Sequence, residues 1–155
     1  MNQREPLKAI GYWQEPEFPE GETLPHPQDL VNPFWRLDER AQIVAYLRAG
    51  KVAAQWRGYA QCRLCPPGTA LGSCDLTDGE WVWPQQLEHY VEKHSLFLPN
   101  EFIDSMRRHK WMVLTPPKKA SGEGQTYDFS YWSLWAAATK DSLVVDEEAE
   151  HEPKV

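Results

Sequence analysis

Two cysteines and two histidines within 33 residues constrain this chain more than any other feature. Cys62 and Cys65 are separated by two residues, and His89 and His94 by four. A structural zinc ion takes four thiolate or imidazole ligands, and pairs at these short spacings are typical of zinc-binding domains. The sequence therefore predicts one structural Zn²⁺ ion bound by these four side chains.

The distance between the two pairs is unusual. Cys65 and His89 are separated by 23 residues, against about 12 in the zinc finger that reads DNA. The insertion holds a Pro-Pro-Gly loop and an Asp-Gly turn, which widen the hairpin without keeping the ligands apart. Two alternatives stay open: Cys74 replaces one histidine, or the cysteines are buried thiols and the histidines ordinary residues that bind no metal.

A closed set of four protein ligands favours a structural metal over a catalytic one, because a catalytic zinc keeps a coordination position for water. A zinc deaminase would carry a His/Cys-x-Glu motif upstream of a P-C-x-x-C motif. Here Tyr59-Ala60-Gln61 precedes the cysteine pair, and no such motif lies upstream. We therefore expect a protein that is not an enzyme.

Length and hydropathy indicate a soluble protein. The 155 residues suit one domain. No run of 18 apolar residues occurs, and no hydrophobic segment follows Met1, so we expect neither a membrane span nor a signal peptide. We expect a cytoplasmic location, where cysteines serve as thiols or metal ligands more often than in disulfides.

Charge and proline content divide the chain into three parts. Residues 1–33 hold six of the 13 prolines and six acids, and residues 141–155 hold six acids and one lysine. Residues 34–140 hold 11 acids against 13 bases, a net charge of +2. We predict a proline-rich extended arm at 1–33, a zinc-binding α+β domain at 34–140 and an acidic, disordered tail at 141–155.

The proline-rich arm is expected to contain neither a helix nor a central strand, because proline fixes φ and lacks the N–H donor. Aromatic and apolar residues are spaced along it: Tyr12, Trp13, Phe18 and Leu24. We expect the arm to lie across the domain and to be held there by these side chains. A proline-rich segment that binds a partner is the alternative.

Capping residues, turns and periodicity predict the elements of the central part. The fold predicted is a small single α+β domain, in which a zinc-stapled β-hairpin and helix are flanked by further helices. The expected elements are a helix from Phe34 to Ala49, a strand from Lys51 to Gln61, an Asp78-Gly79 turn before a strand at 80–83, helices at 85–94 and 101–109, a strand at 111–114, a mobile loop at 115–126, and a helix or strand at 127–138.

The residues around the predicted site resemble a group of small uncharacterised bacterial proteins. In that group a GxSxCRxCG-like segment precedes an LTDGxYxWPExLxHYxxxH-like one, and here the corresponding residues are 58–66 and 76–94. The similarity reaches Phe102, and this chain departs from the pattern at Ala60, Pro66 and Gln85. The resemblance implies that the cysteine pair and both histidines belong to one unit, and it implies no activity.

Three functions follow as hypotheses. The first is a non-catalytic, zinc-binding protein-interaction module, for example an immunity or inhibitor protein that neutralises a basic toxin or enzyme. The second is a nucleic-acid-associated regulator that uses Arg107, Arg108 and Lys110. We rank it below the first, because the body is near neutral and the predicted histidine-bearing helix carries two glutamates and one lysine. The third is an enzyme that uses the scattered residues His26, His109, Asp78 and Glu80.

Overall fold

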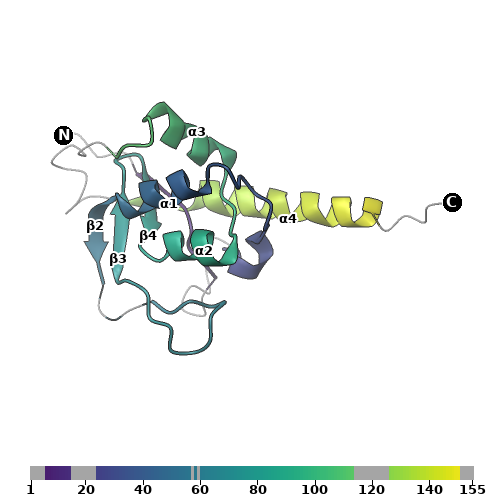
Figure 1. The fold of residues 1–155 in the computed structure, drawn as a ribbon, viewed down its shortest axis with the longest axis horizontal. Coiled ribbons are helices and arrows are strands. Elements are labelled where there is room, and N and C mark those ends of the chain that lie inside the picture. The colour runs from purple at the N-terminus through teal and green to yellow at the C-terminus, as the bar shows by residue number, and fades with distance from the viewer. Residues whose placement is uncertain (1–5, 15–23, 57, 59, 114–125, 151–155) are drawn as a thin grey trace.

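A computed structural model describes residues 6–14, 24–56, 58, 60–113 and 126–150, with the backbone alone described for 141–150. Its fold is α+β, as predicted: a five-stranded mixed sheet in the order β2-β3-β4-β1-β5 and four α-helices within these residues (Figure 1). The strands are β1 (Leu7–Ala9), β2 (Lys51–Gln55), β3 (Cys74–Thr77), β4 (Trp81–Pro84) and β5 (Tyr127–Asp128). The helices are η1, a 3-10 turn (Pro27–Leu30), α1 (Arg40–Arg48), α2 (Leu87–His94), α3 (Asn100–Arg108) and α4 (Ser130–Glu150).

The β3–β4 hairpin confirms the predicted Asp78-Gly79 turn. Gly79 has φ +97°, a value that costs a residue with a Cβ atom but not glycine. One carboxylate oxygen of Asp78 accepts hydrogen bonds from the N–H groups of Glu80 (2.9 Å) and Trp81 (2.8 Å). The turn is therefore specified by its own residues, which is why the sequence predicts it.

Strand β1 shows that the prediction of an arm without a central strand is wrong. Leu7–Ala9 lies between β4 and β5 and pairs parallel with both. The N–H groups of Lys8 and Ile10 donate to carbonyls of Glu80 and Val82. Residues 7–10 contain no proline, so this short interval can form the ladder hydrogen bonds that the flanking prolines cannot.

The segment beyond β1 is held to the domain as predicted. Trp13 and Leu24 are buried, at 5% and 8% exposure. Trp13 packs edge-on against Tyr90 of α2, with ring centroids 5.3 Å apart. Phe18, the other aromatic residue expected to hold the arm, lies outside the described residues.

Helix α1 begins at Arg40 and not at Phe34, so the predicted helix start is wrong. The intervening residues form turns, and Arg36 has φ +41°, which is incompatible with a helix. Asn32 accepts a hydrogen bond from the N–H of Phe34 at 3.0 Å, so it closes a local turn where a helix cap was expected.

The C-terminal half of the chain departs from the predictions at residues 111–113. No strand forms there, and Trp111 lies in a turn with φ +62°, while Leu114 and residues 115–125 of the predicted loop lie outside the described residues. Helix α4 includes residues 141–150 of the segment predicted as an acidic tail. In Figure 1 this half of α4 extends away from the rest of the fold. Among the described helices, none is both long and apolar enough to cross a bilayer.

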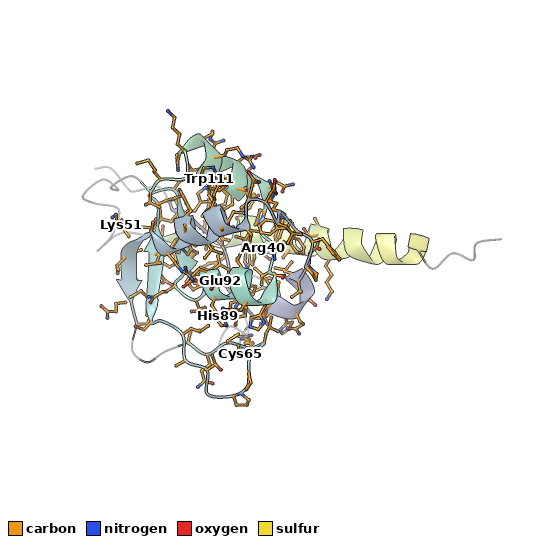
Figure 2. All side chains as sticks on the ribbon, viewed as in Figure 1. Arg40, Lys51, Cys65, His89, Glu92 and Trp111 are labelled. Atoms are coloured by element: carbon orange, nitrogen blue, oxygen red, sulfur yellow. The ribbon has the colours of Figure 1, made fainter. Side chains whose placement is uncertain are left out.

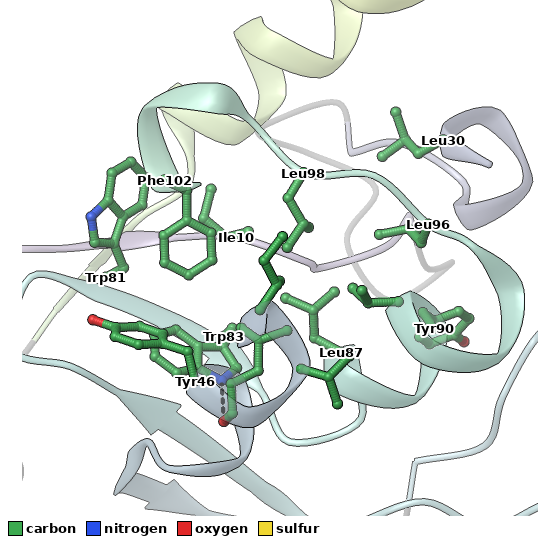
Figure 3. Packing of buried hydrophobic residues seen from close by; sticks show 14 of the residues in the cluster. Ile10, Leu30, Tyr46, Trp81, Trp83, Leu87, Tyr90, Leu96, Leu98 and Phe102 are labelled. Atoms are coloured by element: carbon green, nitrogen blue, oxygen red, sulfur yellow. Dashed lines mark hydrogen bonds between the residues drawn. The ribbon is translucent and has the colours of Figure 1, made fainter. Parts of the chain in front are cut away.

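The main core is formed by side chains of the sheet and of helices α1, α2, α3 and α4. Its largest fully buried side chains include three tryptophans, Trp81, Trp83 and Trp132. Figure 3 shows side chains from α1, β4, α2 and α3 meeting there with Ile10, the residue after β1, and with Trp83 donating its indole N–H to the carbonyl of Leu47 at 3.1 Å. This core fixes the position of α2, which carries two of the predicted metal ligands.

A buried carboxylate joins three segments to β3. Asp75 is 3% exposed, and it accepts hydrogen bonds from the hydroxyl of Tyr12 (2.9 Å), the indole of Trp56 (2.7 Å) and the hydroxyl of Tyr127 (3.0 Å). Burial and the nearby carboxylate raise the pKa values of both tyrosines. Asp75 thus connects the N-terminal segment, the end of β2 and β5.

Replacing Asp75 with alanine is expected to destabilise the fold by about 2–3 kcal/mol, because the substitution leaves three donors without their acceptor. Urea unfolding followed by tryptophan fluorescence measures this change. Asp75→Asn keeps one acceptor oxygen and should lose less stability. An Asp75→Ala variant as stable as the native chain would contradict the structural role of this carboxylate.

Candidate metal centre

The two cysteines lie on a loop that leaves β2 and returns to β3 (Figure 1). The N–H of Cys62 donates to the carbonyl of Thr69 at 3.2 Å, which closes the loop behind the cysteine pair. The N–H of Leu64 donates to the sulfur of Cys62 at 3.4 Å. This turn directs both thiols toward α2, as the two-residue spacing predicts.

The two histidines lie on α2. His94 is the last helical residue, because Ser95 takes φ +55° and the N–H groups of both Ser95 and Leu96 donate to the carbonyl of Tyr90. Residues five positions apart point about 140° apart on a straight helix. Because α2 ends at His94, the His94 ring can lie on the same side as the His89 ring.

The structure brings all four predicted ligands together. One donor atom from each of Cys62, Cys65, His89 and His94 lies within 4.8 Å of the others. The sulfur of Cys65 is 3.4 Å from Nε2 of His89 and 3.2 Å from Nε2 of His94, and the sulfur of Cys62 is 3.3 Å from Nε2 of His94. Figure 2 shows Cys65 and His89 close to each other, beside α2.

The three sulfur–nitrogen distances of 3.2–3.4 Å are close to those around one small tetrahedral ion. With metal–sulfur bonds of about 2.3 Å and metal–nitrogen bonds of about 2.0 Å, ligand atoms at tetrahedral angles lie about 3.3–3.8 Å apart. Hydrogen bonding alone explains the cluster less well. Nε2 of His94 faces both sulfurs, whereas a ring nitrogen offers a single proton or a single lone pair. The Cys₂His₂ group can therefore hold a metal ion.

Electrostatics at the centre suits a cation. Burial lowers the pKa of His94, and the nearby His89 lowers it further, so the neutral, metal-binding form of the ring is favoured. Burial raises the pKa of the Cys65 thiol, and Cys62 raises it further. A bound cation reverses that preference, since it stabilises the thiolate. A metal ion bound here would hold the sulfurs as thiolates.

The loop that carries the cysteine pair, residues 60–73, is termed the metal loop. Gln14 and Tyr90 support it, and the sequence does not reveal either contact. The N–H of Arg63 donates to the hydroxyl of Tyr90 at 2.9 Å, and the Arg63 guanidinium donates to the carbonyl of Gln14 at 2.6 Å. Tyr90 is otherwise a fully buried core residue. The metal loop is thus joined to both α2 and the N-terminal segment through contacts between residues far apart in the chain.

Cys74 lies apart from the group of four. It is the first residue of β3, where it pairs with Gln55, and its N–H donates to the Gln85 side chain at 3.3 Å. Among the described residues, the metal-competent group contains Cys62 and Cys65 and not Cys74. The alternative in which Cys74 replaces a histidine gains no support from this geometry.

The three basic residues proposed as partner contacts follow one another at the end of α3. Arg107 is engaged within the protein: its guanidinium reaches both carboxylate oxygens of Glu39, at 2.8 and 2.7 Å, and Asp104 at 3.0 Å. The hydrogen bond that Glu39 accepts from Arg107 is the main cause that lowers the pKa of the Glu39 carboxyl group. Arg108 and Lys110 are exposed.

The residues of the enzyme hypothesis are partly brought together, through a tyrosine that the sequence does not single out. The buried hydroxyl of Tyr46 donates to Asp78 at 2.6 Å and lies 2.9 Å from Nδ1 of His109. Because the hydroxyl gives its one proton to the carboxylate, His109 must donate to it through Nδ1. Glu80 contributes its backbone N–H to Asp78, and His26 is not part of this network.

The evidence for the metal centre is the convergence of four ligand atoms from two separate segments. The two short spacings predict each pair, and the packing of the loop against α2 brings the pairs together. Comparisons with protein-family models, with curated proteins and with solved structures return no match for this chain.

Proposed function

We propose that this protein is a non-catalytic, zinc-binding protein-interaction module. The observation that carries the proposal is the group of four ligand atoms within 4.8 Å, contributed by Cys62, Cys65, His89 and His94. Two thiolates and two imidazoles are a ligand set typical of structural zinc, and they are too soft for magnesium or calcium.

The role that fits this ion is a cross-link. Backbone hydrogen bonds of the loop that carries Cys62 and Cys65 join its own two arms, for example Leu71 to Ala60 at 2.7 Å, whereas α2 is packed into the main core. A zinc ion bound by both fixes the loop against the helix. Four protein ligands complete a tetrahedral shell and leave no position for a reacting water, which supports a structural ion.

A protein is the partner we propose. Trp56 is 60% exposed, and its indole is held by Asp75 at 2.7 Å, so a large aromatic side chain is presented in a fixed orientation. Exposed tryptophans are frequent at the energetic centres of protein interfaces. A basic toxin or enzyme suits the acidic ends of the chain, and binding of such a protein that weakens at high salt and with Trp56→Ala tests this version.

The nucleic-acid alternative receives no specific support. Arg107, the first of its three basic residues, is bound to Glu39 and Asp104. Helix α2 carries Glu88 and Glu92, which bind Arg48 at 3.0 and 3.1 Å. Phosphate binding needs clustered cations that are free to replace counterions, so the described surface of α2 and α3 favours a protein partner.

Metal analysis tests the zinc assignment. Purified protein is expected to hold one zinc per chain, and Co²⁺ in its place should give the strong visible absorption of a tetrahedral thiolate site. Cys62→Ser should lower the zinc content at least about tenfold, because it replaces a soft ligand with a hard one. Cys74→Ser is the matched control and should keep the full content.

A stoichiometry near zero in protein prepared with zinc present would overturn the assignment. Equal loss of metal in Cys62→Ser and Cys74→Ser would instead indicate that the ligand set includes Cys74. Retention of zinc without any partner would leave the metal site established and contradict only the interaction role.

A further inference from the structure

A groove lined largely by apolar side chains lies next to α4. The groove has a volume of about 460 Å³, and its walls are Trp35, Phe97 and Trp135, with Val31, Asn32, Leu98, Asn100, Ala138 and Thr139 completing it. Phe97 meets Trp35 and Trp135 with ring centroids 6.5 and 5.7 Å apart. Lined by three aromatic rings, the groove is suited to an apolar side chain.

A protruding phenylalanine stands next to this groove. Phe34 is 82% exposed, and it lies between the groove residues Asn32 and Trp35 in the chain. Val31 lines the groove and is 41% exposed. In the sequence, Leu37 lies two positions from Trp35 and is 62% exposed, and Leu134 precedes Trp135 and is 71% exposed. Exposed apolar residues that gather in this way mark a contact surface.

The loop 31–39 that carries Phe34 is held rigidly. The Arg40 guanidinium donates to the carbonyls of Asn32, Pro33 and Trp35 and to the hydroxyl of Ser95. The guanidinium of Arg36 reaches Glu39 at 2.8 Å and Asn100 at 2.9 Å, which stabilises its own unusual φ of +41°. A phenyl group presented on a rigid loop loses little conformational entropy when it is buried.

Charge around the groove favours a second copy of the chain as the occupant. Ion pairs join Arg36 to Glu39 and Lys140 to Asp29, and with Asp38 and Arg40 the formal charges beside the groove sum to zero. Two copies of a neutral patch do not repel each other, although each whole chain carries −7. A strongly basic partner would find no excess of acid here.

We propose that this patch, defined as residues 31–39, 97–100 and 134–140, is a two-fold dimer interface in which Phe34 of each copy enters the groove of the other. In a two-fold interface the same surface patch serves both copies, so the patch must be complementary to itself. This patch carries both a protruding side chain and a groove, which meets that requirement. Of its 20 residues, 17 are at least partly exposed, since Leu98, Pro99 and Ala136 are buried. A stable interface of standard size uses about 20–30 residues and 800 Å² a side, roughly 8% of the 10037 Å² surface of this chain, so the patch is at the small end of that class.

Sedimentation equilibrium of the zinc-loaded full chain, over a range of concentrations, tests the proposal. The native chain should dimerise, and Phe34→Ser should raise the dissociation constant at least about 30-fold, since the loss occurs twice in each dimer. Met112→Ser is the matched control, because Met112 is 61% exposed and lies outside the patch. Circular dichroism establishes that each variant is folded.

A mixing experiment distinguishes this geometry from any other mode of self-association. Phe34→Ser lacks the protruding ring, and Ala138→Trp is designed to fill the groove, so each variant alone should be monomeric. Their mixture should form heterodimers, because Phe34 of the second variant can enter the open groove of the first. A monomeric native chain, a dimer insensitive to Phe34→Ser, or a foreign protein bound by this patch to the monomer would overturn the proposal.

Discussion

Removing zinc from the loaded protein is expected to lower its thermal midpoint by about 8–16 °C. A ligand present at 1,000 times its dissociation constant stabilises the folded state by about 4 kcal/mol, and 1 kcal/mol corresponds to about 2–4 °C in a chain of this size. Complete unfolding is not expected, because most of the buried side chains in the core around Trp81, Trp83 and Trp132 come from outside the metal loop. Scanning calorimetry before and after exhaustive chelation measures the shift.

The site of the change distinguishes a local cross-link from a general effect of the chelator. Amide hydrogen exchange should increase at residues 60–73, including the N–H of Arg63 that donates to Tyr90. Exchange in β4 should change much less. The chelator should have no effect on the midpoint of Cys62→Ser, which is already metal-free. An unchanged midpoint in the chelated native chain would refute the structural role of zinc.

Trp83→Ala is expected to destabilise the protein by about 3–5 kcal/mol, the usual cost of removing a large aromatic side chain from a core. The Trp83 ring is fully buried and lies 6.1 Å from the Tyr46 ring and 5.5 Å from the Phe102 ring, measured between centroids. A Cβ atom on Gly50 would approach Trp83 to 2.7 Å, so the packing around this indole is tight. The loss should affect α1, β4 and α3 together.

Urea unfolding of Trp83→Ala, Trp83→Phe and Met112→Ala measures this effect and separates its causes. Trp83→Phe keeps a ring but removes the indole N–H that donates to the carbonyl of Leu47 at 3.1 Å, while that carbonyl keeps its longer hydrogen bond from Gly50 at 3.4 Å, so an intermediate loss is expected. Met112→Ala changes an exposed side chain and should stay within about 0.5 kcal/mol of the native chain. Equal stabilities for Trp83→Ala and Met112→Ala would contradict the core described here.

The candidate site is predicted more completely than the fold. The two ligand pairs are encoded by spacings of two and four residues, and the Asp78-Gly79 turn by its own side chains. Such features depend on neighbouring residues, so local chemistry determines them. The sequence could not show that Arg63 binds Tyr90 and Gln14, because those contacts depend on how the loop packs.

Elements that depend on distant partners are the ones predicted incorrectly. Strand β1 is three residues long and follows Pro6, and no local pattern indicates that it pairs between β4 and β5. Helix α1 begins late because Arg36 binds Glu39 and Asn100, contacts that stabilise a turn where Asn32-Pro33 indicates a helix start.

The sequence by itself determined the two ligand pairs of the candidate metal centre, since the cysteines and the histidines each stand at a short spacing that allows both members of a pair to reach one ion. Only the tertiary structure decided what surrounds that centre: the inner position of β1, the three donors on Asp75, and the groove beside Phe34. The physical reason is that ligand and turn geometry depends on a few adjacent residues. Burial, in contrast, is decided by competition among all segments of the chain for one core.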